Sequence, residues 1–434
     1  MRKTTSKMWA AAAGVTGIAL LATACSGNSD TPSDEGSDGA AGENITLTLG
    51  TFNEPGYTDE MFKAYEDANP GITIENKKAA TSNEARDNLN TRLASGSGAS
   101  DVEMIEIDWL PELMQYPDKF VDLTDPALDG RWLDWKVAQA TTPDGVLLGY
   151  GTDIGPEAIA YRSDLFAAAG LPTDRAAVAE LLGGKDATWD KYFEVGKQYT
   201  AASGKPFFDG AGAIYQGMIN QVENAYEDED GTIIAASNPE VKDIYDAVTT
   251  ASVTDNLSAH FSQWTDDWVA SFQNDGFATM LAPGWMLGVI EGNSAGVTGW
   301  DIADVFPGGA GNWGGSFMTV PAQGKHTEEA KKFAAWLTAP EQQLQAYKNK
   351  GTFPSQTEAL SSDELLSSTN AFFNNAPAGQ ILANRAVGIV APFKGPNYFA
   401  VNDAMQSALT EVDVNGGDPA AQWDTFVSAV DALG

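Results

Sequence analysis

Residues 45–107 read ITLTLGTFNEPGYTDEMFKAYEDANPGITIENKKAATSNEARDNLNTRLASGSGASDVEMIEI. Three runs in this stretch, at 45–52, 72–75 and 101–107, are rich in β-branched and apolar residues, as strands are. Each interval between them has the apolar spacing of a helix, which ends first at an Asn-Pro-Gly stop and then in a Gly/Ser loop. This β-α-β-α-β order predicts a parallel, doubly wound sheet whose binding edge lies at the carboxyl ends of the strands.

Residues 1–24 have the features of a secretory signal peptide. Three basic residues among the first seven precede the small and apolar run 9–21, which is too short to span a bilayer. The sequence LATACS that follows resembles the lipobox of bacterial lipoproteins, apart from Ala22, where that family most often has Leu. The resemblance implies that Cys25 is lipidated and anchors the protein to the outer face of the cytoplasmic membrane. The alternative is an ordinary cleavage site with a chance cysteine.

Residues 25–44 are predicted to form the lipidated cysteine and a flexible tether, because Ser, Gly, Asp and Ala dominate them. Cys25 is the chain's one cysteine, so an internal disulfide is excluded. Across the chain, 25 Lys and Arg stand against 60 Asp and Glu, a net charge of −35 at pH 7. This acidity disfavours nucleic acid and anionic lipid as partners, and it is typical of a soluble exported protein.

The rest of the chain is long enough for two lobes. About 390 residues follow the tether, more than one hydrophobic core usually organises. Trp336 and Trp423 lie on the apolar faces of expected helices and are predicted to be core residues. Helical spacing and capping residues predict further helices near 327–337, 340–350, 401–412 and 419–430.

A set of short motifs, spread in order over nearly the whole chain, resembles the extracellular solute-binding proteins of carbohydrate ABC importers, the maltose-binding-protein type. The motifs are ANPGI (68–72), SDV (100–102), GYGTDIGP (149–156), YRSDLF (161–166), AGLP (169–172), TWD (188–190), GFATM (276–280), APGW (282–285), GNWGGSFMTVP (311–321) and FPS (353–355). No motif is specific alone, but the ordered set behind a lipobox is.

The resemblance implies an α/β, two-lobe periplasmic-binding-protein-like fold, each lobe a doubly wound sheet flanked by helices, with the ligand cleft between the lobes. The lobes would comprise 45–153 plus 312–352, and 154–311 plus 353–434. The implied function is to capture a di- to tetrasaccharide, β-linked like cellobiose as a first choice, and to deliver it to the permease subunits by hinge closure. The resemblance further implies a monomer that needs no cofactor and meets the membrane only through its lipid.

A sugar ring offers an apolar face for aromatic stacking and a rim of hydroxyls for carboxylates and amides. Trp285, after Ala-Pro-Gly, matches the family's tryptophan at the gate of the cleft and is the first choice. Asp108 and Trp109 end the third strand, where an open sheet presents ligand groups. Asp153, at the first expected hinge crossing, matches an acid that contacts ligand in the family, and Tyr398 matches a stacking aromatic.

Further candidates follow from loop position. Trp313 lies in the Gly-rich loop, and Asn53 and Glu54 come directly after the first strand. Trp264 and Trp268, in the sequence WTDDW, have the right chemistry for a sugar, although the start of a surface helix explains them equally well. Each of these residues is expected to contact the sugar, and a structure can show whether it lies in the cleft.

Enzyme motifs are present but lack their structural context. Residues 292–296 fit the G-x-S-x-G elbow and 309–314 fit G-x-G-x-x-G, yet a strand-like run follows each of them instead of a helix. His260 and His326 are isolated from each other and from the one cysteine, which leaves little for zinc or for a catalytic nucleophile. A secreted, lipid-anchored glycoside hydrolase remains the alternative, since acid pairs cannot be excluded by spacing. The prediction is binding without catalysis and without a metal.

Overall fold

The computed structural model describes residues 44–434. The expectations for the signal peptide, for Cys25 and for the tether up to residue 43 lie outside these described residues. None of the helices in the described part has both the length and the apolar character that crossing a membrane requires.

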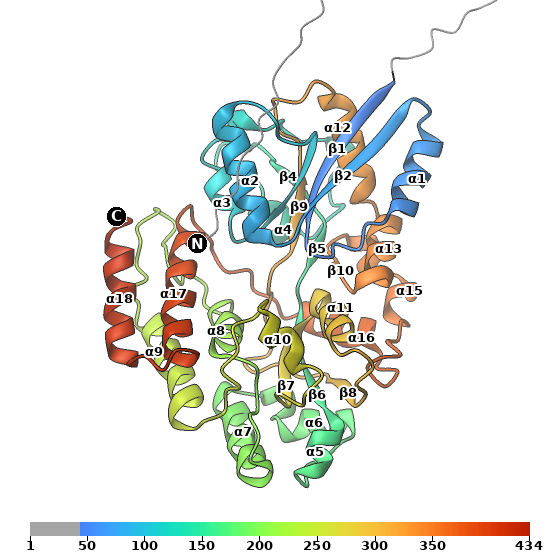
Figure 1. Ribbon diagram of the computed structural model, residues 1–434. Helices are drawn as coiled ribbons and strands as arrows, with labels where there is room; N and C mark the ends of the chain where they lie inside the picture. Colours follow the sequence, from blue (N-terminus) through green and yellow to red (C-terminus); the bar gives the residue numbers. More distant parts are fainter. Residues whose placement is uncertain (1–43) are drawn as a thin grey trace, which may run out of the picture. The chain divides into compact units, whose positions relative to one another are not determined.

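Five strands form the larger sheet, in the order β2-β1-β3-β9-β4 (Figure 1). Strand β1 pairs in parallel with β2 and β3, whereas β9 runs antiparallel to both β3 and β4. The parallel arrangement expected for the first three strands is therefore confirmed, and a strand from much later in the chain completes the sheet. The bounds are β1 (Ile45–Phe52), β2 (Ile72–Ala79), β3 (Val102–Glu106), β4 (Gly149–Gly151) and β9 (Ser316–Thr319).

Helices pack on this sheet and complete the first lobe. Local sequence sets their ends: at the start of α2, Thr81 Oγ1 accepts from Glu84 N at 3.2 Å, and Glu84 Oε2 accepts from Ala80 N at 2.8 Å. The same helix ends at Gly96, whose φ of 71° suits glycine. The helices are α1 (Asp59–Ala68), α2 (Ser82–Ser95), α3 (Leu110–Leu113), α4 (Asp134–Gln139), α12 (Thr327–Leu337) and α13 (Pro340–Lys350).

The smaller sheet has the order β7-β6-β8, and both of its pairings are antiparallel. The doubly wound sheet expected for the second lobe is therefore replaced by a three-stranded antiparallel one. All residues of these strands are buried, and strands buried on both faces read as continuous apolar runs whatever their direction. The bounds are β6 (Glu157–Arg162), β7 (Thr279–Pro283) and β8 (Trp300–Ala303).

The second lobe is mostly helical, and α17 packs along α18 at the end of the chain (Figure 1). Trp423 of α18 packs against Tyr245, with ring centroids 5.2 Å apart, but it is only partly buried at the margin of the core, as is Trp336 of α12. The helices are α5 (Ser163–Ala168), α6 (Arg175–Leu181), α7 (Trp189–Ser203), α8 (Ala211–Ile219), α9 (Pro239–Thr249), α10 (Asp266–Ser271), α11 (Gly284–Asn293), α14 (Thr357–Leu360), α15 (Asp363–Leu366), α16 (Ala378–Ala386), α17 (Tyr398–Asp413) and α18 (Pro419–Asp431).

Three chain crossings connect the two sheets. Strand β5 (Asp153–Ile154) pairs antiparallel with β10 (Phe353–Pro354), and Pro156 forms a bridge with Asn312. The crossings are close: a Cβ on Gly155 would lie 1.8 Å from the backbone oxygen of Trp313. The limits expected for the two lobes fall at these crossings and stay a prediction.

Candidate functional site

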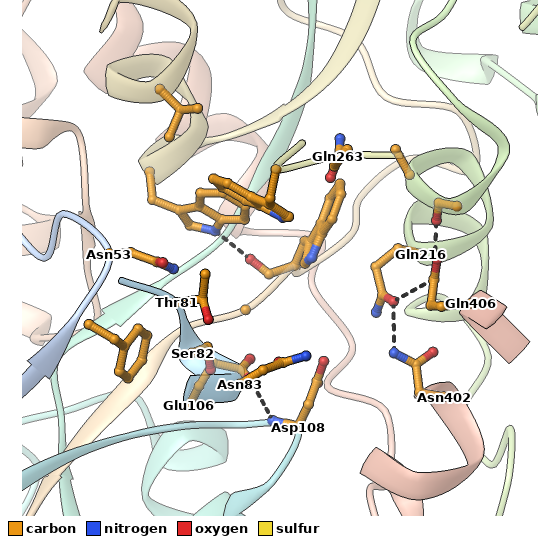
Figure 2. Close-up of a pocket in the computed structure, with 18 of the residues that line it drawn as sticks. Asn53, Thr81, Ser82, Asn83, Glu106, Asp108, Gln216, Gln263, Asn402 and Gln406 are labelled. Atoms are coloured by element: carbon orange, nitrogen blue, oxygen red, sulfur yellow. Dashed lines mark hydrogen bonds between the residues drawn. The ribbon is translucent and has the colours of Figure 1, made fainter. Parts of the chain in front are cut away.

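A cavity of about 740 Å³ opens beside the crossings and is lined from both lobes. Its size is typical of sites that bind small molecules, which span about 300 to 1,000 Å³. Its lining combines tryptophans, carboxylates, amides and hydroxyls (Figure 2). The polar and aromatic residues of the lining include Asn53, Glu54, Thr81, Ser82, Asn83, Glu106, Asp108, Asp153, Gln216, Gln263, Trp264, Trp285, Trp313, Asn402 and Gln406.

Trp264, Trp285 and Trp313 form an aromatic cluster on one side of the cavity. The rings of Trp264 and Trp285 are stacked, with centroids 6.1 Å apart and planes 23° apart. Trp313 meets Trp285 edge to face at 5.7 Å, and Trp285 Nε1 donates to the backbone oxygen of Trp313 at 2.8 Å. The Trp285 ring is thereby fixed in orientation, so the cluster offers a preformed apolar surface for stacking.

The backbone explains how these rings reach the cavity. Trp285 is the second residue of α11, directly after the buried strand β7. Trp264 has a φ of 71°, in the left-handed region, and it remains 47% exposed. Thr265 then caps α10, its Oγ1 accepting from the backbone nitrogen of Trp268 at 3.3 Å. Trp313 is followed by Gly314, whose φ of 79° lets the loop turn back towards β9.

Two carboxylates line the cavity at the end of β3. Asp108 N donates to Glu106 Oε2 at 2.9 Å (Figure 2), and the Asp108 carboxylate forms an ion pair with Lys394. Only 4% of the Lys394 side chain is exposed. Sequence reasoning found Asp108 and missed Glu106. The available signal was the position of Glu106 as the last residue of β3, because an open sheet presents ligand groups at the carboxyl ends of its strands.

The charge of Asp108 raises the pKa of both of its neighbours, Glu106 and Lys394. Burial, and then the charge of Asp108, raises the pKa of Glu106 well above its usual value. Burial alone lowers the pKa of Lys394, but Asp108 and Tyr398 outweigh burial, so its pKa is raised. The site therefore holds one charged pair and, in Glu106, a carboxyl group that favours its neutral form. A neutral carboxyl can donate a hydrogen bond to a ligand oxygen.

Asp153 lies where the first crossing meets the cavity and is 7% exposed. Its Oδ1 accepts from Thr152 Oγ1 at 2.7 Å and from Ser316 N at 3.0 Å. Burial raises the pKa of Asp153, and Lys136 opposes that rise. Burial in turn lowers the pKa of Lys136 to about 7. Asp153 thus holds the crossing through its hydrogen bonds and also lines the cavity.

Three amide side chains from α8 and α17 form a second polar group of the lining. Asn402 Nδ2 donates to Gln216 Oε1 at 3.2 Å, and Gln406 Nε2 donates to the backbone oxygen of Gly212 at 3.2 Å. Figure 2 shows the three amides gathered on one side of the view. Amides can both donate to and accept from hydroxyl groups without carrying charge. Sequence reasoning missed them, although Asn402 and Gln406 are polar residues four apart on an apolar helix.

Most of the site residues predicted from the sequence line the cavity together. They are Asn53, Glu54, Asp108, Asp153, Trp264, Trp285 and Trp313. Their assignment as ligand-binding residues stays a prediction.

Trp109, Trp268 and Tyr398 do not line the cavity. They are at most 1% exposed, so the direct ligand contact expected of them is corrected to a supporting position. Trp109 Nε1 donates at 2.9 Å to Ser82 Oγ, which does line the cavity. Trp268 packs behind Trp264, with ring centroids 5.3 Å apart. These rings are core residues because their faces are enclosed by protein on all sides.

The chain matches the family model of bacterial extracellular solute-binding proteins over residues 60–374. It belongs to this family. Within the described residues 44–434, no group of three or more His, Cys, Asp or Glu side chains could hold a metal ion.

Named members of the solute-binding family show what this one is similar to. It is 27% identical to the arabinooligosaccharide-binding protein of Bacillus subtilis over 327 residues, 71% of this chain and 72% of that protein. It is 25% identical to the lactose-binding protein of Rhizobium radiobacter over 258 residues, 56% of this chain and 58% of that protein.

Solved structures give the same family and fold. A crystal structure of an extracellular solute-binding protein of family 1 is similar at a TM-score of 0.80 and 45% identity, over 89% of this chain and 99% of that one. An ABC transporter-associated binding protein from B. animalis subsp. lactis, in complex with β-1,6-galactobiose, is similar at a TM-score of 0.76 and 19% identity. That likeness covers 90% of this chain and 97% of the other, and it shows the fold alone. The two-lobed α/β fold is thereby confirmed for this solute-binding protein.

Proposed function

We propose that this solute-binding protein is the substrate-binding component of a carbohydrate ABC importer and that it captures an oligosaccharide outside the cell. One observation carries the proposal: stacked and edge-on tryptophans share a cavity of about 740 Å³ with uncharged amides and hydroxyls. An apolar surface beside a polar rim is the arrangement that a sugar ring requires. The relatives named for arabinooligosaccharide and lactose support the same ligand class.

The proposed ligand is a di- to tetrasaccharide, with a β-linked one such as cellobiose as the first choice. In this proposal Trp285, Trp264 and Trp313 stack on sugar faces, while Glu106 and Asp108 bind hydroxyls at the end of β3. The amides of α8 and α17 would bind a further ring. Asn53, Glu54 and Asp153 complete the polar rim.

Hinge closure would trap the sugar between the lobes. Two contacts that join the expected lobes support this step: the ion pair of Asp108 with Lys394, and the Arg86 guanidinium 4.1 Å from the centre of the Phe399 ring. Both pairs would separate if the cleft opened. The closed form of a monomer, with lobes at 45–153 plus 312–352 and 154–311 plus 353–434, would be what the permease subunits recognise.

The lipid anchor is a separate part of the proposal. Cys25, in the lipobox-like LATACS, would carry the lipid that holds the protein on the outer face of the cytoplasmic membrane. Because lipidation needs the thiol, Cys25→Ser should release the protein into the medium. Retention of that variant at the membrane would contradict the anchor.

The relatives are solute-binding proteins, and we propose that this chain likewise does not cleave its sugar. The alternative, a glycoside hydrolase, needs two carboxyl groups on either side of a glycosidic bond. Glu106 and Asp108 are adjacent, and Asp108 is held by Lys394, which disfavours that arrangement. Homogeneous protein incubated with its best sugar should leave it intact, and steady release of shorter sugars would favour the hydrolase.

A thermal-shift screen tests the function directly. The panel comprises arabinobiose and arabinotriose, cellobiose, xylobiose, lactose, maltose and chitobiose, with longer oligomers of each. A sugar at 100 times its dissociation constant stabilises the folded state by about 2.7 kcal/mol. One sugar class should raise the melting temperature, whereas a panel without any response would contradict the proposal.

A further inference from the structure

Trp264 reaches the cavity from loop 255–265, which connects a π-helical turn (Thr250–Thr254) to α10. Three non-glycine residues of this loop have left-handed backbone: Asn256 (φ 56°), His260 (φ 60°) and Trp264 (φ 71°). L-residues rarely adopt this conformation, and it persists only where the surroundings hold it. The contacts that hold the loop therefore decide where Trp264 lies.

Asp413, the last residue of α17, is one buried anchor of the loop. Its Oδ2 accepts from Ser258 Oγ at 2.9 Å and from Ala211 N at 2.8 Å, at the start of α8. Its Oδ1 accepts from Ser252 Oγ in the π-helical turn. One carboxylate thus joins the loop to α8, α17 and the turn.

His260 adds a titratable partner to this anchor. Its Nδ1 lies 2.7 Å from Asp413 Oδ1, and its backbone nitrogen donates to Ser258 Oγ at 2.9 Å. The ring is 41% exposed, whereas the Asp413 side chain is 2% exposed. The hydrogen bond to Asp413 raises the pKa of His260, and burial opposes this rise. Burial raises the pKa of Asp413, but His260 and Ser252 outweigh burial, so its pKa is lowered.

We propose that His260, paired with Asp413, is a positioning residue for Trp264, and that this makes the shape of the aromatic cluster depend on pH. When the imidazolium loses its proton, its ion pair with Asp413 becomes a weaker hydrogen bond from a neutral imidazole to the carboxylate, and the left-handed backbone is held less firmly. The inference rests on the proposed function, because it treats Trp264 as part of the sugar site. Its test, however, requires no sugar.

Other titratable groups must be separated from His260. From the elements packed around the ring, Asp413 of α17 faces it, whereas the start of α8 and the π-helical turn contribute the uncharged Ala211 and Ser252. Asp209, before α8, holds Gln263 of the same loop at 2.8 Å, and its burial raises its pKa. His260→Asn leaves Asp209 in place, so the response of that variant separates the two groups. Lys136 titrates at a pKa of about 7, beside Asp153 in the first lobe.

The test follows the Trp264 ring itself. The whole chain is labelled with 5-fluorotryptophan, and the Trp264 signal is assigned by its loss in Trp264→Phe. Between about pH 5 and about pH 9, the wild-type signal should shift with a midpoint above 6.5, the unperturbed value for histidine. In His260→Asn the shift should disappear, because asparagine keeps an amide donor and tolerates a positive φ but does not titrate.

The controls make each outcome decisive. His326→Asn removes the other histidine, at the start of α12 in the first lobe, and should leave the Trp264 shift unchanged. Asp413→Asn should move the midpoint to lower pH, since the charge that raises the pKa of His260 is gone. A Trp264 signal that does not titrate, or one that titrates equally in His260→Asn, overturns the proposal. So does an unmoved midpoint in Asp413→Asn, should His260→Asn not fold. A failed sugar screen would contradict the proposed function and leave this readout unaffected.

Discussion

Trp264 and Trp268 are four residues apart and in ring contact, yet they belong to different layers of the molecule. Trp264 is 47% exposed and lines the cavity, whereas Trp268 is fully buried and donates its Nε1 hydrogen to Asp209 Oδ2 at 3.0 Å. Trp285 lines the cavity, as Trp264 does, and Trp109 is buried, as Trp268 is. A layer of rings that faces the cavity therefore rests on a second, buried layer.

The difference has a measurable form. Removing a ring that has one face towards the cavity should lower the protein's affinity for its ligand, because that face is covered only in the complex. Removing an enclosed ring should lower the stability of the folded protein, because protein already covers both faces of that ring. Substitutions in the two layers should therefore change different quantities, ligand affinity in one layer and folding stability in the other.

Trp268→Ala should have the largest effect, on stability. It removes a fully buried indole and leaves Asp209 with one partner fewer, so the free energy of unfolding should fall by about 3 to 5 kcal/mol. Chemical denaturation measures this loss, and Trp268→Phe should recover much of it. An unchanged free energy of unfolding in Trp268→Ala would show that Trp268 does not support the fold as a buried ring.

Trp285→Ala should affect affinity most. Losing apolar burial and an aromatic contact costs about 2 to 4 kcal/mol of binding, a weakening of about 30-fold to 1,000-fold. Titration calorimetry with the best sugar of the panel measures it. Trp423→Ala is the matched control: Trp423 lies on α18, packs against Tyr245 and does not line the cavity, so its loss should lower the melting temperature and leave affinity unchanged. Normal binding by an early-melting Trp285→Ala would show that Trp285 is packing.

Trp264→Ala should have a smaller effect of the same kind. Because the ring is already 47% exposed, its removal should weaken binding by about 5-fold to 30-fold, or about 1 to 2 kcal/mol. The free energy of unfolding should fall by less than in Trp268→Ala, because about half of the Trp264 side chain is already exposed. Trp264→Phe should retain part of the affinity. A stability loss as large as that of Trp268→Ala would show that Trp264 is a supporting core ring, like Trp268.

The sequence could predict the two-lobed fold because much of its information is local. The strand-helix alternation at 45–107 and the helix ends at Asn69, Gly351 and Asp418 are set by neighbouring residues, and the structure confirms them. Strand direction in the second lobe is not local. Strand β6 pairs with β7 and β8, more than 100 residues later, and nothing in an all-buried strand encodes that choice.

The lining of the site was predictable only in part, for a related reason. Aromatic side chains and strand ends predicted Trp285 and Asp108 correctly as cavity lining. The same signals also predicted Trp109, which is buried because segments distant in the sequence pack on it. Gln216 and Asn402 were missed because amides on helices are usually solvent-exposed. Only the packing of α8 beside α17 turns them into a cavity lining.

Glu106→Gln should have the smallest effect, and its sign depends on pH. Burial and the charge of Asp108 raise the pKa of Glu106, so below that pKa the carboxyl is neutral and can donate a hydrogen bond to sugar. Glutamine is a permanent neutral donor. In the acidic part of the range the variant should therefore bind within about 10-fold of wild type, about 1.4 kcal/mol.

As the pH rises through the raised pKa of Glu106, wild type loses its donor and gains a second carboxylate beside Asp108, so only its affinity falls. The ratio of the two affinities across pH removes the contribution of His260, which titrates in both proteins, and leaves that of Glu106 together with Lys136, whose pKa the charge of Glu106 raises. Glu54→Gln is the control: the hydrogen bond from Lys78 lowers the pKa of Glu54, which stays charged throughout, so its ratio to wild type should be flat. A Glu106→Gln ratio equally independent of pH would show that Glu106 is ionised in the site, and the neutral donor would be lost from the proposal.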